Sequence, residues 1–497
     1  MKFFPDLNSF KTLCKESNVI PIHCDFYGDT ETPVTTYSKL RGNGASFLLE
    51  SVVGGESLGR YTFLGCNPKA EIRVYEDRTV IENDDGTIEE MKTGEDPLAY
   101  VESYLKDIHT PQTTCDIPLF TGGAVGYVSY EYIHSIENTI PKPEKRELDT
   151  PLAYFLITDT VVCFDHAKQI LSVYSNAFID DNPEEAYEKA CQSIRSIMEK
   201  ISVPASDSLI AIDTTMVPDL ELKSNFTQEN FEEGVLRIKD YIKEGDVFQT
   251  VLSQCFHTDY PLSPLDLYRS LRNVNPSPYM TLLESRDFGI VSASPEVHVK
   301  VQDRKVEIRP IAGTRPRGKN WKEDQIMEKE LLGDVKEKAE HMMLVDLARN
   351  DIGRVCKIGS IEVPNFMVIE RYSHVMHIVT QVLGVLDDDR NAFDLLRATF
   401  PAGTISGAPK VRAMQIISEL EQMQRGVYSG ALGYFSFDGN HDSAIAIRTA
   451  VVKDSKVYFQ AGAGIVADSD PQSEYEETVN KAKGMLKAVQ QSLACNH

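Results

Sequence analysis

Residues 337–354 read Glu-Lys-Ala-Glu-His-Met-Met-Leu-Val-Asp-Leu-Ala-Arg-Asn-Asp-Ile-Gly-Arg. The stretch has no proline and no glycine before Gly353, so it predicts one helix that ends there. Glu337, Glu340 and His341 are spaced i, i+3 and i+4 and therefore share one face. Glu340 also lies in line with apolar residues and points partly toward the core. A buried carboxylate is costly unless it meets a cation, which leaves two interpretations, an ion pair with lysine or arginine and a metal or catalytic site.

The size and charge of the chain limit its class. With 497 residues it is longer than a single core usually spans, so we expect two domains or one large interleaved fold. Its net charge of −24 should repel nucleic acid and anionic membranes. Nine cysteines without a CxxC pair are typical of reduced thiols. Because there is neither a signal peptide nor a run of ~18 apolar residues, we expect a cytoplasmic protein that binds no nucleic acid and no membrane.

A change in composition divides the chain. Residues 201–224 contain scattered proline and serine with little periodicity, so we place a boundary there, between an N-terminal domain at 1–205 and a second domain at 225–490. The local patterns predict strands at 33–37, 46–53, 427–437, 443–452 and 456–463, a loop at 311–324, and a last helix from about 471 to 489.

The last predicted helix repeats the carboxylate spacing of the first. Glu474 and Glu477 are i, i+3, as are Glu337 and Glu340. Two helices with paired carboxylates could together offer oxygen ligands to a Mg²⁺ ion. The alternative is a solvated ion pair between Glu477 and Lys481, which are i, i+4. Spacing alone favours the ion pair.

Two segments near the end of the chain are suited to an anion. In the predicted strand 443–452, Arg448 shares a face with two alanines, which leaves room for a carboxylate beside the guanidinium. The alternative is an ion pair of Arg448 across the sheet. Gly462 and Gly464 would let backbone N–H groups approach a carboxylate or phosphate closely, although this signal is weak by itself.

A third candidate segment, 400–410, has the composition of a phosphate loop without its spacing, since Lys410 follows proline rather than glycine. It predicts a loop that opens a helix, whose N-terminus with Thr404 and Lys410 nearby would bind a carboxylate. Further back, His374 and His377 would point to opposite faces of an alternating strand, so at most one lines a given site. Either can equally be a hydrogen-bonded structural histidine.

Taken together and in order, these segments resemble the chorismate-utilising enzymes, and within that family the synthase subunits (component I) of anthranilate synthases. The segments that carry the resemblance are 48–51, 310–318, 340–351, 400–410 and 460–477. The resemblance implies an α/β (α+β) fold of large, mixed, mainly antiparallel sheets flanked by helices. It also implies two interleaved subdomains, in which N-terminal strands pack among C-terminal ones.

The resemblance implies an enzyme that converts chorismate and ammonia to anthranilate and pyruvate, the first step of tryptophan biosynthesis, with Mg²⁺ as cofactor. The implied metal ligands are Glu340 and Glu477, with Glu337 and Glu474 nearby. Glu296 is the implied general acid for the leaving hydroxyl. His377 supports the second half-reaction as base or as hydrogen-bond donor, and Thr404 belongs to the same pocket. The implied substrate contacts are Gly313, Thr314, Tyr428, Arg448, Gly462, Ala463, Gly464 and Lys410.

Two positions separate the related activities. Relatives that make isochorismate carry a lysine where this chain has Gln249, and aminodeoxychorismate relatives carry a lysine where it has Ala312. Glutamine cannot act as a base and alanine cannot attack the ring, so both positions favour direct amination. The alternatives are component I of an aminodeoxychorismate synthase and a non-catalytic chorismate- or tryptophan-binding sensor. A nucleotide phosphohydrolase fits poorly, because the 400–410 loop fails its spacing.

The resemblance also implies partners. None of the nine cysteines lies in the glycine-rich elbow that glutamine hydrolysis needs, so a glutamine amidotransferase subunit (component II) should supply ammonia within a hetero-oligomer. Tryptophan is the implied feedback inhibitor. Its implied pocket in the N-terminal half is formed by Glu50, Ser51, Pro278, Tyr279 and Met280. The alternative is a buried strand end and a simple proline turn.

Overall fold

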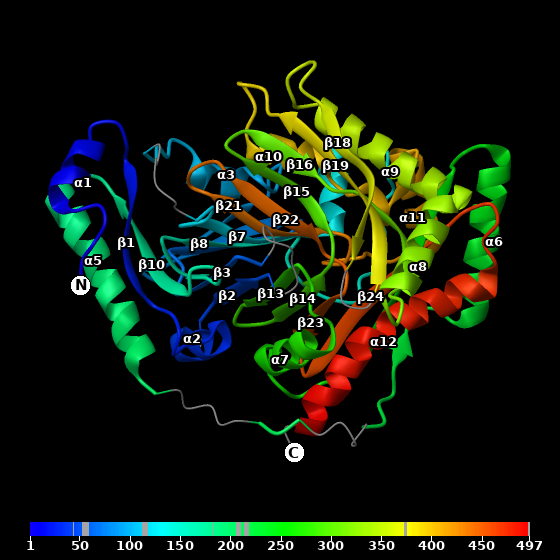
Figure 1. The fold of residues 1–497 in the computed structure, drawn as a ribbon, viewed down its shortest axis with the longest axis horizontal. Coiled ribbons are helices and arrows are strands. Elements are labelled where there is room, and N and C mark those ends of the chain that lie inside the picture. Colours follow the sequence, from blue (N-terminus) through cyan, green and yellow to red (C-terminus); the bar gives the residue numbers. More distant parts are fainter. Residues whose placement is uncertain are drawn as a thin grey trace.

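The structure is a computed structural model that describes residues 1–42, 44–51, 59–111, 118–180, 182–204, 210–212, 218–371 and 375–495. Its strands form two sheets with antiparallel pairing between neighbours (Figure 1). The first sheet has the order β1 (Val19–Tyr27), β10 (Ile170–Phe178), β9 (Thr160–Asp165), β3 (Tyr61–Cys66), β2 (Ser46–Glu50), β13 (Tyr279–Glu284), β14 (Gly289–Ser294), β23 (Thr449–Lys453), β24 (Lys456–Ile465), β12 (Gln249–Asp259) and β11 (Lys223–Ser224), with β20 (Gly407–Ala408) beside β12.

The second sheet begins and ends with different parts of the chain. Its order is β17 (Ile311–Pro316), β19 (Val375–Val385), β16 (Lys305–Ile308), β15 (Val297–Gln302), β22 (His441–Ile445), β21 (Ala431–Ser436), β7 (Gly123–Val128), β8 (Ala153–Thr158), β4 (Ala70–Val74), β5 (Arg78–Asn83) and β6 (Ile88–Lys92), with β18 (Glu362–Arg371) beside β19. The α-helices are α1 (Leu7–Leu13), α2 (Pro33–Leu40), α3 (Ala99–Leu105), α4 (Ile133–Ile136), α5 (Pro183–Ser202), α6 (Gln228–Glu244), α7 (Pro264–Val274), α8 (Trp321–Gly333), α9 (Val335–Gly353), α10 (Ala392–Thr399), α11 (Lys410–Glu421) and α12 (Pro471–Cys495), and η1 (Tyr130–Tyr132) and η2 (Gly403–Ile405) are 3₁₀ turns.

Each sheet joins a block of strands from the N-terminal half of the chain to a block from the C-terminal half. In the first sheet β2 pairs with β13, and in the second β7 pairs with β21. This arrangement confirms the expected mixed, mainly antiparallel and interleaved fold. We propose 1–205 and 225–490 as the two halves of the molecule, with strands of one half completing the sheets of the other.

The core has three layers. An aromatic-rich inner cluster that includes Phe47, Phe63, Tyr127 and Tyr154 draws side chains from both sheets, so the sheets face each other there. A second cluster packs the outer face of the first sheet against α5, α7 and α12. A third packs the outer face of the second sheet against α3, α9 and α10. The helices therefore cover the outside and the sheets form the centre.

Residues 337–353 lie in α9, the helix that their pattern predicts. Asp334 caps its first turn by accepting hydrogen bonds from Lys336 N (3.0 Å) and Glu337 N (3.2 Å). His341 and Leu344 of this helix are buried, whereas Glu340 is half-buried. The last helix begins after Asp470, as expected, and continues to Cys495.

Three local predictions were wrong. Residues 33–37 lie in α2 rather than in a strand, because Thr32 forms a capping box with Thr35 and Pro33 occupies the first helical turn. The expected loop at 311–324 contains β17 and the start of α8. The expected strand 443–452 is two strands, β22 in the second sheet and β23 in the first. The chain crosses between sheets at 446–448, where Arg448 has φ +50°.

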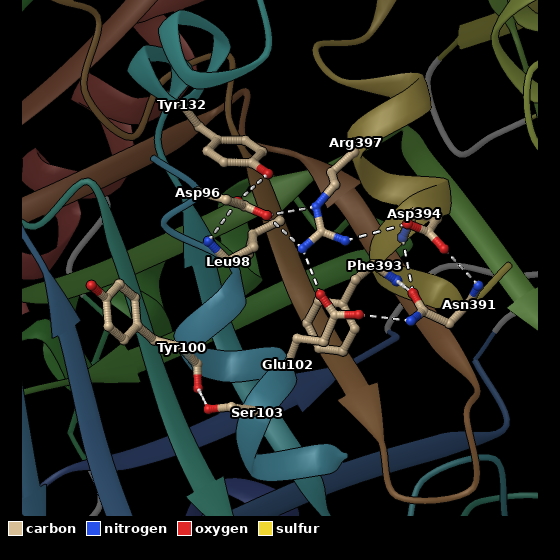
Figure 2. A network of polar contacts seen from close by, with 10 residues as sticks. All are labelled: Asp96, Leu98, Tyr100, Glu102, Ser103, Tyr132, Asn391, Phe393, Asp394 and Arg397. Atoms are coloured by element: carbon tan, nitrogen blue, oxygen red, sulfur yellow. Dashed lines mark hydrogen bonds and ion pairs between the residues drawn. The ribbon is translucent and has the colours of Figure 1, made fainter. Parts of the chain in front are cut away.

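A network of charges joins the two halves (Figure 2). Arg397 of α10 donates from Nε to Asp96 (2.9 Å) and from Nη2 to Glu102 of α3 (2.6 Å). Tyr132 donates to the same Asp96 carboxylate (2.9 Å), and Asn391 donates to Glu102 (2.7 Å). One guanidinium thus holds carboxylates that come almost 300 residues earlier in the chain.

We expect Arg397→Met to lower the free energy of unfolding by about 1–3 kcal/mol, because the charged hydrogen bonds to Asp96 and Glu102 are lost together. The measurement is the thermal unfolding midpoint of the full chain. Arg390→Met is the matched control, since Arg390 is about half-exposed and its nearest carboxylate, Asp389, is 3.8 Å away. Equal midpoints for the two variants would mean that the network adds nothing to stability.

Candidate active site

The site lies where the chain crosses between the sheets. Arg448 occupies the crossover, and its side chain is exposed to solvent. Among the described residues, it makes no ion pair within 4 Å. Although part of the Arg448 side chain reaches solvent, the protein packed around it lowers its pKa, and nearby Glu296 partly offsets this effect. The predicted strand position for Arg448 was wrong, because this residue lies in the crossover between β22 and β23 and not within a strand.

Glu296 is the buried acid beside this cation. It lies between β14 and β15 and is only 6% exposed. Thr404 of η2 donates its hydroxyl to Glu296 Oε1 at 2.7 Å. Burial raises the pKa of Glu296 to about 7, against the lowering effects of Thr404 and Arg448. Glu296 is therefore protonated in a large fraction of molecules near neutral pH, as a general acid requires.

His377 approaches the site from β19. Its Nδ1 lies 3.0 Å from the carbonyl oxygen of Gly313 and 3.1 Å from Thr314 Oγ1. Because a carbonyl can only accept, Nδ1 carries the proton, and Nε2 carries the lone pair. Burial lowers the pKa of His377, so the ring is neutral near pH 7. Gly313 has φ +67°, and a Cβ there would lie 3.0 Å from Glu337 Oε2, so glycine is required.

The glycines of β24, together with Gln249 of β12 and Tyr428, form another part of the candidate site. A Cβ at Gly464 would lie 2.5 Å from Gln249 Nε2, and one at Gly462 would lie 2.8 Å from Tyr428 Oη. The two glycines therefore make room for the side chains of Gln249 and Tyr428. Ala463 points the other way, into a cluster with Phe231 and other apolar residues. The side chain of Ala463 therefore lies outside the candidate site.

Lys410 is not free at the start of α11. It forms an ion pair with Asp351 of α9 at 2.7 Å and donates to the carbonyl of Thr399 at 3.3 Å. The two charges lie beside the small cavity that Glu296 and Thr404 also line. Lys410 therefore connects α9 to the loop before α11, and its charge is already matched.

The four carboxylates expected at a metal site come from facing parts of α9 and α12. Burial raises the pKa of Glu340, and Glu337 and Glu477 raise it further, whereas a hydrogen bond from Gln249 (3.2 Å) lowers it. Burial and nearby Glu477 likewise raise the pKa of Glu474. These oxygens repel one another and are the donors that Mg²⁺ prefers, so the residues fit this ion chemically.

The same carboxylates are partly engaged by cations of the protein. Glu337 pairs with Arg315 at 3.0 Å, and Glu477 pairs with Lys481 at 2.7 Å, which is the ion pair that its spacing favoured. Within the ranges that the structure describes, no three acidic, histidine or cysteine side chains are close enough to form a ready-made metal site.

The five residues expected to bind an inhibitor meet at one cavity of about 560 Å³. Glu50 and Ser51 come from the end of β2, and Pro278, Tyr279 and Met280 come from the paired β13 and the turn before it. The Glu50 carboxylate does not point freely into the cavity. It accepts two hydrogen bonds from Arg272 and one from Tyr268, all at 2.8 Å. The buried Ser51 hydroxyl has no partner among the described residues.

Two groups of buried polar residues were not predicted from the sequence. They are Tyr268 and Arg272, which bind Glu50, and the ion pair of Arg425 with Glu421. Tyr268 and Arg272 are i, i+4 on α7, and Glu421 and Arg425 have the same spacing, with Glu421 the last residue of α11 and Arg425 beyond its end. This spacing marks pairs that can share a partner or bind each other. It does not reveal that Glu50 lies opposite α7, because that contact spans 222 residues.

In the described part of the chain, no helix has the length and apolar content needed to cross a membrane. The family described as chorismate binding enzyme matches residues 44–487. Anthranilate synthase component 1 of Acetivibrio thermocellus is 44% identical over 496 residues, covering 99% of both chains. Its counterpart in Aquifex aeolicus is 46% identical over 489 residues, covering 97% of both.

Solved structures agree with these matches. Anthranilate synthase component I from Streptococcus pneumoniae TIGR4 is 38% identical with a TM-score of 0.77, and the match covers 93% of this chain and 98% of that one. The menaquinone-specific isochorismate synthase MenF from Escherichia coli has a TM-score of 0.71 at 16% identity, covering 97% of this chain and 99% of MenF. The second likeness concerns the fold alone.

Proposed function

Because the chain belongs to the chorismate-binding enzyme family, we propose that it is the synthase subunit of an anthranilate synthase. It converts chorismate and ammonia to anthranilate and pyruvate in the cytoplasm, as the first step of tryptophan biosynthesis. The observation that carries the proposal is the buried Glu296, whose pKa is raised to about 7, beside Arg448. Gln249 and Ala312, which stand in place of the lysines of related activities, favour direct amination.

The residues of the candidate site have distinct roles in this proposal. Arg448 and the backbone around Gly462 and Gly464 bind carboxylates of chorismate, which is a dianion. Ammonia adds at ring C2 while the C4 hydroxyl leaves, and Glu296 supplies the proton that lets it leave as water. Thr404 orients the Glu296 carboxyl through its 2.7 Å hydrogen bond.

His377 acts in the second half-reaction. The C2 proton must be removed as pyruvate is eliminated, and a neutral imidazole with a lone pair on Nε2 can accept it. The hydrogen bond from Nδ1 to the Gly313 carbonyl (3.0 Å) fixes this tautomer and stabilises the ring once it is protonated. The neutral ring and its fixed tautomer favour a role for His377 as a base rather than as a hydrogen-bond donor.

Glu340 and Glu477 would hold Mg²⁺, with Glu337 and Glu474 in support. Bound there, the ion neutralises a carboxylate of the substrate, which the acidic site would otherwise repel. Among the described residues, the only side chain that donates a hydrogen bond to Glu340 is that of Gln249. Burial, and then the nearby Glu337 and Glu477, raise the pKa of Glu340, and a divalent cation would favour its charged form.

The proposal requires an external source of ammonia. None of the eight described cysteine thiols forms a disulfide, and burial raises the pKa of Cys255 to about 12, so this thiol is a poor nucleophile. A glutamine amidotransferase subunit would therefore supply ammonia in a hetero-oligomer.

The test is an assay of the pure chain with chorismate and Mg²⁺, given either ammonia or glutamine, with mass spectrometry of the products. We expect anthranilate with ammonia and none with glutamine alone. An aminodeoxychorismate product, or tight chorismate binding without turnover, would replace the proposal with one of its alternatives. Glutamine-dependent turnover by this chain alone would remove the need for a partner subunit.

Tryptophan is the proposed feedback inhibitor, bound in the 560 Å³ cavity that residues of both halves of the chain line. Pro278, Tyr279 and Met280 offer an apolar wall to an indole. The Ser51 hydroxyl, which has no partner within the described ranges, offers a polar contact to the ammonium. Inhibition needs different affinities for an active and an inactive arrangement, so chorismate should weaken tryptophan binding in return.

We expect Ser51→Phe to raise the tryptophan concentration for half-inhibition by at least about tenfold, because the ring fills the cavity and removes the hydroxyl. The measurement is a tryptophan titration of the ammonia-dependent activity. Ser196→Phe, at an exposed position of α5, is the matched control. Full inhibition of Ser51→Phe at the wild-type concentration would place the inhibitor elsewhere.

A further inference from the structure

Arg425 lies just after α11, and its side chain is 1% exposed. Its guanidinium donates five hydrogen bonds. Nε and Nη2 bind both oxygens of Glu421 at 2.9 and 2.7 Å, Nη2 also reaches the carbonyl of Val251 at 2.9 Å, and Nη1 reaches the carbonyl of Ile405 at 2.8 Å and Ser429 Oγ at 3.2 Å. The ion pair with Glu421 is buried and electrically neutral overall.

Three of these partners, Ile405, Ser429 and Val251, lie within two residues of a candidate active-site residue. Ile405 follows Thr404, whose hydroxyl binds Glu296. Val251 lies two residues after Gln249 on β12, and Ser429 follows Tyr428. The guanidinium also lies 4.8 Å from the ring centre of Tyr130 and 5.7 Å from that of Tyr428.

Glu421 extends the contacts to a further strand. Its Oε1 accepts hydrogen bonds from the backbone N (2.9 Å) and the hydroxyl (2.7 Å) of Ser253 on β12. That hydroxyl accepts one from Gln460 on β24 (2.8 Å), two residues before Gly462. The Arg425 cluster, which we define as Arg425, Glu421, Ser429 and Ser253, thus connects η2, β12, β24 and the turn at Tyr428.

A general stabilising role does not account for this geometry. Replacing a buried ion pair by apolar residues is often neutral or stabilising, so such a pair is weak evidence for stability. The planar fork of arginine is required because donors must point at Glu421 and at two carbonyls from different segments at once, which an ammonium cannot do in the same plane. The contacts converge on backbone beside the reacting groups.

We propose that Arg425 is a positioning residue that fixes Thr404, and through it Glu296, relative to Gln249 and Tyr428. It touches no substrate. The inference rests on the proposed function, because it assigns the positioned groups to that reaction.

The test compares Arg425→Lys with wild type in the full chain. We expect kcat with ammonia to fall by about 10- to 100-fold and the KM for chorismate to change less than about threefold, because a misplacement of about 1 Å can cost 100-fold in rate. Arg412→Lys is the matched control. Arg412, on α11, also pairs with a carboxylate, Asp246, and lies over Tyr241, but it contacts none of the site segments.

The pH profile provides a readout that a purely structural role would not change. Arg448 and the Thr404 hydroxyl face Glu296, and His298 and the Lys410-paired Asp351 line the same small cavity. If η2 loosens, Glu296 loses the Thr404 hydrogen bond that lowers its pKa, so the alkaline limb of kcat should move to higher pH. Thr404→Val should move it in the same direction, and Arg412→Lys should leave it in place.

Arg425→Lys could fail to fold, so the double variant Arg425→Met/Glu421→Met removes both buried charges together. We expect it to be folded, slow, and faster in hydrogen exchange at 249–254 and 403–408 than wild type. A folded variant of either kind with wild-type kcat, pH profile and exchange would overturn the positioning role. If wild type itself makes no anthranilate, the proposed function fails, and the exchange measurement alone decides the role of Arg425.

Discussion

Glu296→Gln should lower kcat by about 10² to 10⁴-fold, the usual contribution of a positioned general acid. Glutamine keeps the size of the side chain and can still accept the Thr404 hydrogen bond, but it cannot release a proton to the leaving hydroxyl. The measurement is the rate of anthranilate formation with the concentration of free ammonia held constant at each pH. In wild type the rate should fall above about pH 7, where Glu296 loses its proton, and this limb should vanish in the variant.

The pH dependence of stability distinguishes a loss of catalysis in Glu296→Gln from a loss of structure. The folded pKa of Glu296 is raised to about 7 from the usual 4.5, so the folded state holds a proton that the unfolded state releases between these values. The contribution of Glu296 to stability is therefore greatest below about pH 4.5 and declines until about pH 7. Glu296→Gln removes this decline and should be as stable as wild type or more so at pH 8. A rate within threefold of wild type would contradict the role of Glu296 as the acid.

Glu340→Gln should abolish anthranilate formation, with kcat/KM reduced by about 10³-fold or more, because charge stabilisation by a metal is worth several kcal/mol. Glutamine keeps the shape of the side chain but brings no charge to Mg²⁺. Calorimetric titration of the chain with Mg²⁺ gives a readout besides activity, and binding should weaken beyond detection at millimolar concentrations.

The control for Glu340→Gln is Asp346→Asn on the same helix, where an exposed carboxylate pairs, among the residues that the structure describes, only with Arg349 at 2.9 Å. Without Mg²⁺, Glu340→Gln should be at least as stable as wild type, because burial and nearby acids raise the pKa of Glu340 and its charge is unfavourable there. Near-normal activity of the variant at low Mg²⁺ would remove Glu340 from the metal site.

The helices α9 and α12 could be predicted from sequence because their signals are local. Each follows a capping aspartate and has a run free of interior proline. The carboxylate spacing along both helices, and the glycines of β24, likewise follow from the chain itself. Which sheet a strand joins is not a local property, and so 443–452 appeared as one strand although it crosses between two.

The electrostatic state of the site could not be read from sequence. Lys410 looked free at a helix N-terminus, but Asp351 of α9 binds it from 59 residues away. Glu50 looked like an open carboxylate, but α7 holds it. In both cases the partner comes from a segment that only the completed fold brings near, so residue type and spacing indicate a charged group without indicating what it binds.

The interleaved sheets have a consequence for synthesis on the ribosome. The strand β7 needs β21 beside it, and these strands are separated by about 300 residues. At about 5–20 residues per second, β7 waits roughly 15–60 s for its neighbour to emerge. During that interval its backbone edge is open to other nascent chains. The N-terminal half should therefore depend on chaperones until translation is nearly complete, and neither half should be obtainable as a folded fragment.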